Sequence, residues 1–462
     1  MINLILTLIL LASVVGVVLF VVDAAMGAWE RLTELPEVGA FAADSAGKVM
    51  LAIGAAALAA VLALLVAQHG LWLLAVAGGG IVGLLKVIAR TGRPPHSLKR
   101  RVAWRLGFWP RLSWTDRLYL GWSRGWTHRW RWAMARREDS VGIIGPPGRG
   151  KTMAVIVPQL LLSGGPAIST SVKTDVLRAT AARRLQLARA HGGDVYVYAP
   201  MARGPVEGLV PVKWSPLDGC RNDAVVPLRV DALVDTADQG GEQMDAGHWR
   251  SGAKQILRGC FYAAAHHDTK PGDLSLVHRW VATQDLKQPL SILAQLKTPA
   301  ATMWMQELLG VTATPPRERA SFFTRARDSL AATSDPAVME SCSRTDLDLE
   351  SFLLTRSTLY VVSPSQHQRR VAPLIAALLE SIIITAYDLH HRGKLDGRLL
   401  ASLDELANIA PLPNLSAHVS QGRGQGVNIT WAIQSHAQLR DVYGEHTAEA
   451  IWSATSAKLV FG

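Results

Sequence analysis

The hydrophobic pattern separates an apolar N-terminal part from a longer part in which short apolar runs alternate with polar stretches. Residues 4–22 form an unbroken apolar run, and residues 49–88 form a second run with three polar interruptions, Gln68, His69 and Lys86. At about 1.5 Å per helical residue, the first run is long enough to span a hydrocarbon core of roughly 30 Å. The pattern predicts membrane-spanning helices.

Two alternatives stay open for this region. The first run could also be a signal peptide, although such peptides begin with a basic segment and only Ile2 and Asn3 separate this run from Met1. The second run is either two helices that turn near His69 or one crossing with an apolar extension. We assign residues 1–89 to a transmembrane anchor.

The charges that flank the apolar runs predict the orientation of the anchor. The charged residues of 23–47 are five acidic residues and one arginine, whereas thirteen arginines and lysines lie between Arg90 and Arg137, with Asp116 as the one acidic residue among them. Because basic flanks stay on the cytoplasmic side, we expect everything after residue 90 to be cytoplasmic, as part of a multi-pass protein of a bacterial inner or plasma membrane.

Residues 90–139 form a basic, tryptophan-rich linker. This segment holds seven of the fifteen tryptophans: Trp104, Trp109, Trp114, Trp122, Trp126, Trp130 and Trp132. Interleaved indoles and guanidinium groups suit an anionic membrane surface, and the same chemistry could stack on nucleic-acid bases. We favour the membrane surface because the segment follows the predicted helices directly.

From residue 140 onward the pattern is that of an α/β domain. Seven short apolar runs alternate with helical stretches, and they read VGIIG, AIST, DVYVYAP, TLYVVSP, RLLASLDE, NITWAIQ and KLVFG. This alternation predicts a mostly parallel sheet with helices on both faces. Residues 245–333 read as helical throughout, so we expect an inserted all-helical domain between the two parts of a nucleotide-binding domain, residues 140–244 and 334–462.

Composition adds limits on partners and chemistry. The 462-residue chain carries 48 Lys and Arg against 37 Asp and Glu, which favours phosphate-bearing partners or an anionic membrane face. Its three cysteines are far apart and show no metal-ligand spacing, so neither a disulfide framework nor a zinc site is indicated.

One motif predicts nucleotide binding. A complete G-x-x-x-x-G-K-T follows a strand-like run and precedes an apolar helix, and its residues are Gly145, Pro146, Pro147, Gly148, Arg149, Gly150, Lys151 and Thr152. In such a loop the backbone N–H groups surround the phosphates of ATP, the lysine reaches the β and γ phosphates, and the threonine hydroxyl binds Mg²⁺.

A second acidic site is needed for hydrolysis, because Mg²⁺ must be held and a water molecule oriented. The run RLLASLDE supplies it: Asp404 ends an apolar strand and is suited to the metal, and Glu405 follows and is suited to activating the water. In the alternative interpretation Asp404 merely caps the next helix, and the complete P-loop upstream argues against it.

Residues 403–439 (LDELANIAPLPNLSAHVSQGRGQGVNITWAIQSHAQL) closely resemble the corresponding region of the type IV secretion coupling proteins. Lys173 and Asp175, in SVKTD, stand where that family has a D-P-K-G-E-like strand end, and the run WSPL at 214–217 resembles its N-P-L element. Two departures are visible. SVKTD lacks the family's Pro, Gly and Glu, and the chain stops at Gly462, the last residue of KLVFG, where family members usually continue, so we expect a truncated or differently closed fold.

The resemblance implies a RecA-like P-loop ATPase that delivers single-stranded DNA with its attached relaxase to a conjugation channel and works as a homo-oligomer, a hexameric ring. It also implies roles for two more residues. Arg423 matches an arginine proposed to reach the γ-phosphate of a neighbouring subunit, and Gln434 matches a polar sensor of nucleotide state. The alternatives are a surface charge and a polar strand end.

Three other functions remain as rivals. A septal-type double-stranded DNA translocase shares the membrane-plus-motor plan, but the helical insertion and the absence from this chain of a winged helix argue against it. A protein-export ATPase without nucleic acid is the second. The third is a non-catalytic membrane adaptor, against which the joint presence of Lys151, Thr152, Asp404 and Glu405 argues.

Overall fold

A computed structural model describes residues 115–124, 130–238, 246–364, 366 and 368–462. The predicted anchor, residues 1–89, and most of the linker lie outside the described residues. The described residues belong to one compact unit, Leu112–Gly462.

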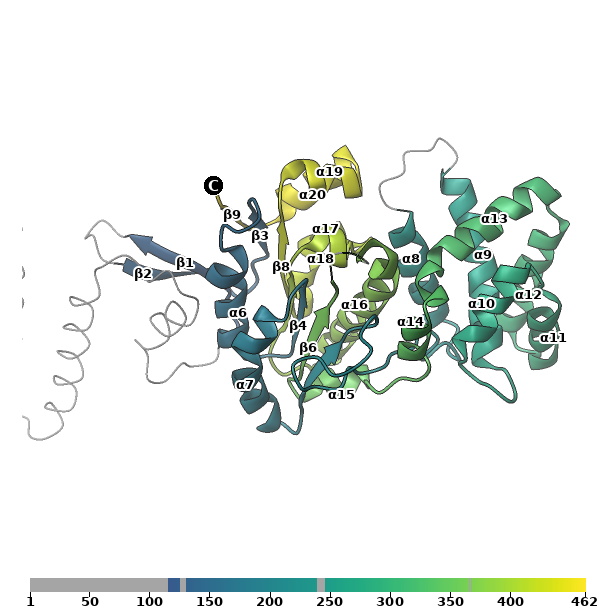
Figure 1. Cartoon of the computed structure of the whole chain (residues 1–462), viewed down its shortest axis with the longest axis horizontal. Coiled ribbons are helices and arrows are strands. Elements are labelled where there is room, and N and C mark those ends of the chain that lie inside the picture. Colours follow the sequence, from purple (N-terminus) through teal and green to yellow (C-terminus); the bar gives the residue numbers. More distant parts are fainter. Residues whose placement is uncertain (1–114, 125–129, 239–245, 365, 367) are drawn as a thin grey trace, which may run out of the picture. The chain divides into compact units, whose positions relative to one another are not determined.

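A seven-stranded sheet forms the centre of this unit (Figure 1). Its order is β5-β6-β4-β7-β8-β3-β9, and every neighbouring pair is parallel. The strands are β3 (Val141–Ile144), β4 (Ala167–Ser171), β5 (Val195–Tyr198), β6 (Thr358–Val362), β7 (Leu399–Leu403), β8 (Val427–Ile433) and β9 (Ala457–Val460). Each overlaps one of the seven apolar runs, and β4, β8 and β9 extend one residue beyond theirs, which confirms the predicted α/β fold with a mostly parallel sheet.

The inner strands are buried along their whole length because helices cover both faces of the sheet. Helices α6 (Val157–Leu162) and α7 (Asp175–Arg189) lie on one side in Figure 1, and α16 (Gln368–His391) lies on the other. Among the described residues α16 is the one helix long and apolar enough to cross a membrane, but 78% of its most apolar window is buried inside the protein. It serves here as a core helix.

A helical block separates β5 from β6. It contains α8 (Val225–Ala237), α9 (Ala246–Ala265), α10 (Leu274–Thr283), α11 (Lys287–Leu296), α12 (Pro299–Ala313), α13 (Pro316–Ser329), α14 (Pro336–Ser341) and α15 (Leu349–Leu354). Helices α9 to α13 gather at one end of the unit, while α8 packs against both α9 and the core helix α16 (Figure 1). Helix α8 therefore joins the helical block to the sheet domain.

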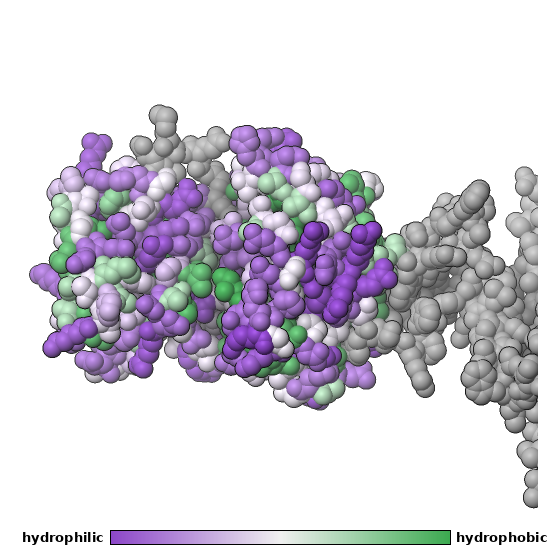
Figure 2. Space-filling model, turned by 180° about the vertical axis from the view of Figure 1, so that it is seen from behind, coloured by the Kyte–Doolittle hydropathy of each residue, from purple (hydrophilic) through white to green (hydrophobic). Residues whose placement is uncertain are grey.

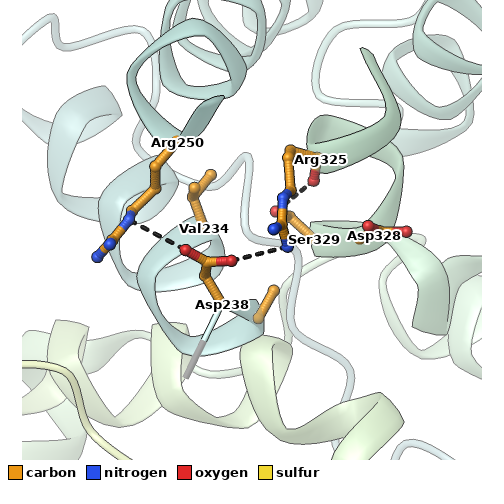
Figure 3. Close-up of a pocket in the computed structure, with 7 residues that line it drawn as sticks. Val234, Asp238, Arg250, Arg325, Asp328 and Ser329 are labelled. Carbon is orange, nitrogen blue, oxygen red and sulfur yellow. Dashed lines mark hydrogen bonds and ion pairs between the residues drawn. The ribbon is translucent and has the colours of Figure 1, made fainter. Parts of the chain in front are cut away.

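Ion pairs hold α8 to helices α9 and α13. The Asp238 carboxylate, which is 7% exposed, lies between two arginines from α9 and α13 (Figure 3). Arg250 Nε is 3.2 Å from Asp238 Oδ2, and Arg325 Nη1 is 2.8 Å from Asp238 Oδ1. Asp235 and Asp231, about one and two turns earlier on α8, pair with basic residues of α9 in the same way. This seam is polar, unlike the apolar contact of α8 with α16.

An antiparallel hairpin, β1 (Tyr119–Arg124) with β2 (Trp130–Met134), precedes the sheet domain. The Gln159 side chain of α6 donates a hydrogen bond to the Tyr119 carbonyl over 2.9 Å, so the hairpin is attached to the helix that follows the P-loop. The interpretation of residues 90–139 as a linker missed this hairpin. Its signal was the alternation of tryptophan and arginine at Trp130, Arg131 and Trp132, a period-two pattern typical of a strand.

The remaining elements follow β7 and β8. They are α17 (Leu406–Ile409), α18 (Leu415–Gln421), the 3₁₀ turn η3 (Gly422–Gln425), α19 (His436–Tyr443) and α20 (Glu445–Ala454). The face shown in Figure 2 is mainly hydrophilic, with apolar residues scattered over it. Cys220, Cys260 and Cys342 are all buried free thiols.

Candidate active site

The P-loop lies between the carboxyl end of β3 and the helical segment Thr152–Leu162, which begins with the π-helical turn η1 (Thr152–Ile156). Gly148 and Gly150 have φ angles of 77° and 83°, a region that favours glycine, and a Cβ atom at either position would meet open space. The backbone, and not a bulky neighbour, therefore requires these glycines. The proline pair and Arg149 are exposed at the tip of the loop.

Lys151 folds back along the inside of the loop. Its side chain is 6% exposed, and Nζ donates to the Gly145 carbonyl and, over 3.2 Å, to the Pro146 carbonyl. A buried ammonium group satisfied by loop carbonyls lies beside the backbone amides at a helix N-terminus, where anions bind readily.

Asp404 lies directly opposite the P-loop threonine. Thr152 Oγ1 donates a 2.6 Å hydrogen bond to Asp404 Oδ2, joining residues 252 positions apart. Thr170, near the end of β4, fixes the backbone at the same point by donating to the Asp404 carbonyl over 2.8 Å. The hydroxyl and the carboxylate that the sequence assigned to a metal ion are therefore adjacent.

Burial raises the pKa of Asp404 above the ordinary range of a carboxyl group, with a further contribution from the negative charge of Glu405. The hydrogen bond from Thr152 and the charge of Lys151 act in the opposite direction. The net direction means that keeping this carboxylate ionised costs free energy in the protein alone, and a cation at the same position would relieve that cost.

Glu405 is held by two side-chain amides. Gln434 Nε2 donates to Glu405 Oε2 over 3.1 Å, and Asn408 Nδ2 donates to the same oxygen over 3.3 Å. Glu405 itself has a φ of 52°, in the left-handed region, so the chain turns sharply between β7 and α17. A non-glycine residue in that conformation is a local strain of the kind that collects at functional sites.

Strand order explains why Gln434 reaches this cluster. Strand β8 lies between β3, which leads into the P-loop, and β7, which ends at Asp404. Gln434 follows β8 at the carboxyl edge of the sheet, so its side chain emerges between the two motifs. Lys151, Thr152, Asp404, Glu405 and Gln434 thus lie together although the chain supplies them from three strands.

Arg423 lies elsewhere. It is exposed in η3, at the amino end of β8, whereas Gln434 follows the carboxyl end of the same strand. Seven residues of extended chain cover on the order of 20 Å, which is much longer than an arginine side chain. The structure therefore does not bring Arg423 to the P-loop of its own chain.

The sequence interpretation missed Thr170 and Asn408. Asn408 could have been noticed, because a polar residue three positions after Glu405 lies on the same face of a helical turn. Thr170 had no local signal, since its contact depends on the pairing of β4 with β7. Lys173 and Asp175 lie just after β4 and are exposed.

Solved structures of a plasmid coupling protein share this fold. The plasmid coupling protein TrwB in complex with the non-hydrolysable ATP analogue ADPNP aligns with a TM-score of 0.54 and 20% identity, covering 70% of this chain and 71% of that one. TrwB with ADP and Mg²⁺ aligns with a TM-score of 0.51 and 19% identity over the same shares of the two chains. At this identity the likeness establishes the fold alone.

Sequence comparison identifies the family. Conjugal transfer protein TraG of Escherichia coli is 23% identical over 324 residues, which cover 64% of this chain and 48% of TraG, and a second TraG sequence is 22% identical over the same length. The chain thus spans about half the length of the curated relatives it matches. The family model described as Type IV secretory system Conjugative DNA transfer matches residues 115–462. The chain therefore belongs to the type IV secretion coupling proteins, as its sequence predicted.

Proposed function

We propose that this chain is a membrane-anchored ATPase that couples ATP hydrolysis to the delivery of single-stranded DNA, with its attached relaxase, to a type IV secretion channel. The observation that carries the proposal is the 2.6 Å hydrogen bond between Thr152 and Asp404, with Glu405 and Gln434 beside it. A nucleotide-binding loop without this acidic pair would suit an adaptor equally well.

The residues fit ATP and Mg²⁺. The loop offers backbone amides and Lys151 to phosphates, and Thr152 and Asp404 offer the hard oxygen donors that Mg²⁺ prefers. TrwB, with the same fold, binds an ATP analogue and ADP with Mg²⁺. When bound, the metal ion would neutralise phosphate charge and polarise the γ-phosphoryl group.

The chain's own groups have distinct tasks in hydrolysis. Glu405 presents a carboxylate that orients a water molecule and accepts a proton from it at Oε1. Gln434 and Asn408 restrict the rotation of that carboxylate by donating to Oε2, which leaves Oε1 available for the water. Lys151 and Asp404 bind the nucleotide and its metal without taking part in proton transfer.

A ring of subunits would complete the site. Because Arg423 is too far from its own P-loop, we assign it to the γ-phosphate of the neighbouring subunit, where it stabilises the charge that develops in the transition state. This role calls for a homo-oligomer, and we propose a hexamer.

The membrane and the DNA are the remaining partners. The apolar runs of residues 1–89 support a multi-pass anchor in the bacterial inner membrane, with the ATPase domain in the cytoplasm. Membership of the conjugative DNA transfer family supports DNA, a relaxase and channel components as partners.

The test is ATP turnover by the full chain in lipid nanodiscs, measured without DNA, with single-stranded DNA and with double-stranded DNA. Stimulation by single strands above the other two conditions supports the proposal. Stimulation by duplex alone would favour a double-stranded DNA translocase. Turnover that is the same with and without DNA would favour a protein-export ATPase. The absence of turnover under every condition would favour a non-catalytic adaptor.

A further inference from the structure

We propose that Arg398 is a positioning residue for the 3₁₀ turn η3 (Gly422–Gln425), which we call the Arg423 turn, and that it holds this turn in place from the β7 side. The inference rests on the proposed function of Arg423 and deepens it, because it names the group that sets where that arginine is presented. Arg398 immediately precedes β7, at the amino edge of the sheet, and it lies at the opposite end of that strand from Asp404.

The contacts of Arg398 converge on the turn. Its side chain is buried at 8% exposure, and Nη2 donates to the Arg423 carbonyl over 2.5 Å. The same nitrogen is 3.4 Å from the Val427 carbonyl, and Nε donates to Asn428 Oδ1 over 2.5 Å. One guanidinium group therefore joins the residue that carries the proposed catalytic charge to the first two residues of β8.

The chemistry of the partners argues for positioning rather than charge pairing. The three direct acceptors are two carbonyl oxygens and one amide oxygen, none of which carries a charge. Burial lowers the pKa of Arg398, so this cation is kept in a costly place. Its rigid planar fork of donors fixes several acceptors in one set geometry, whereas the ammonium group of a lysine is a compact charge on a flexible stem.

The turn is shaped to lie close to α16. A Cβ atom at Gly422 would be 3.0 Å from the Tyr387 hydroxyl, and one at Gly426, where φ is 77°, would be 2.7 Å from His390 Nδ1. Below them, Tyr387 and Glu380 of α16 both hydrogen-bond His418 of α18. Glycine lets the backbone rest on this packed surface while Arg398 holds it from the strand side, so the Arg423 side chain faces outward from a fixed base.

The fold contains a matched control. Arg184 is another fully buried arginine at the amino edge of the sheet, and it donates to Thr358 Oγ1 and to the Ser163 and Gly165 carbonyls over 2.5 to 2.7 Å. Like Arg398 it satisfies neutral acceptors, but these acceptors are not in the Arg423 turn. Arg184→Gln therefore removes a comparable set of buried hydrogen bonds but leaves the placement of Arg423 unchanged.

The experiment compares Arg398→Gln, Arg184→Gln, Arg423→Ala and the double variant Arg398→Gln/Arg423→Ala as full chains in nanodiscs. Misplacing a catalytic group by about 1 Å can cost roughly 100-fold, so we expect Arg398→Gln to lower kcat roughly 10- to 100-fold while the KM for ATP changes by less than about twofold. Arg184→Gln should lower Tm at least as much but keep kcat. The double variant should be no slower than Arg423→Ala alone, because Arg398 acts through Arg423.

ATP turnover by oligomers mixed from two variants tests the same inference in a second way. Lys151→Ala subunits carry an intact Arg423 turn, so adding them to Arg398→Gln subunits should restore turnover at the intact P-loops. If Arg398→Gln does not fold, Arg398→Lys takes its place, since it keeps the cation but loses the fork.

Three outcomes overturn the inference. One is equal kcat in the Arg398 and Arg184 variants, and another is a double variant slower than Arg423→Ala by the full factor of Arg398→Gln. In both cases, if Arg423→Ala itself has a low kcat, the proposed catalytic role of Arg423 still stands. The third is wild-type turnover in Arg423→Ala, which removes the proposed role of Arg423 and the positioning inference with it.

Discussion

Gln434 and Glu405, which follow two neighbouring strands, are joined by a 3.1 Å hydrogen bond from the glutamine amide to Oε2 of the carboxylate. The backbone N–H of Gln434 in turn donates to Gln438 Oε1 over 2.9 Å, so the glutamine is itself held by the first turn of α19. A movement of the backbone at the end of β8 would therefore shift the Glu405 carboxylate, to which we assign water activation.

Replacing Gln434 by leucine removes the amide donor at nearly constant volume. We expect kcat to fall roughly tenfold, because the Glu405 carboxylate loses one of its two restraints, while ATP affinity stays within about twofold. Steady-state turnover and nucleotide titration measure the two quantities. Gln306→Leu, at an exposed position of α12, is the control and should change neither. Equal losses in affinity and turnover would show that Gln434 acts in binding instead.

Lys151→Ala and Glu405→Gln should fail in different ways. The first removes the cation that bridges the β and γ phosphates and should abolish hydrolysis through lost nucleotide affinity, while the protein stays in the membrane fraction. The second keeps the phosphate contacts but cannot accept a proton, so it should retain ATP without cleaving it. Filter binding and phosphate release distinguish these results. Wild-type turnover in Lys151→Ala would refute the P-loop assignment, and similar loss of binding in both variants would refute the division of roles.

Asp404→Asn should stabilise the nucleotide-free protein. Since burial raises the Asp404 pKa, the folded state binds this proton more tightly than the unfolded chain, so stability falls as pH rises through the raised pKa. Asparagine does not titrate and avoids this loss. We expect Tm to rise by about 2 °C at pH 7, with the gain shrinking as the pH is lowered to about 4, the ordinary pKa of an aspartate.

The same Asp404→Asn variant should lose most of the extra Tm that Mg²⁺ adds to stabilisation by ATP. Calorimetric scans of both proteins at the two pH values check the prediction. A gain in Tm that is independent of pH would contradict the ionisation argument, and an undiminished effect of Mg²⁺ would contradict the metal assignment.

Arg423→Ala should bind ATP almost normally and lose most of its turnover, because an arginine supplied in trans acts on transition-state charge. Mixed with Lys151→Ala subunits, it should recover activity well above either variant alone, since some interfaces then pair an intact P-loop with an intact arginine. Arg189→Ala, an exposed arginine at the end of α7, is the control. No recovery at any ratio, in oligomers shown to contain both subunits, would exclude action across the interface.

The topology of the proposed anchor can be tested at Ala42, within the acidic segment between the two apolar runs. With two crossings, a cysteine at this position should react with a membrane-impermeant maleimide added from outside the inner membrane, in spheroplasts. Reaction from the cytoplasmic side alone would instead indicate three crossings with the N-terminus outside.

Local signals predicted the sheet strands, the P-loop and the Asp404-Glu405 pair, whereas the role of Gln434 came from the family resemblance. A parallel strand buried on both faces is a short apolar run, and the strands that carry the P-loop, Asp404 and Gln434 all read that way. What the sequence could not predict depends on contacts between distant residues. Thr170 meets Asp404 only because β4 pairs with β7, and Arg398 reaches the Arg423 turn only because β7 pairs with β8.

The buried thiols have a practical consequence for chemical labelling. Cys220, Cys260 and Cys342 are this chain's three cysteines, and burial raises the pKa of Cys220 and of Cys342 to about 12 and that of Cys260 as well. Because maleimides react with accessible thiolates, they should label the folded native protein very little. A single cysteine placed on the surface can then serve as a site-specific fluorophore attachment point without first replacing the native ones.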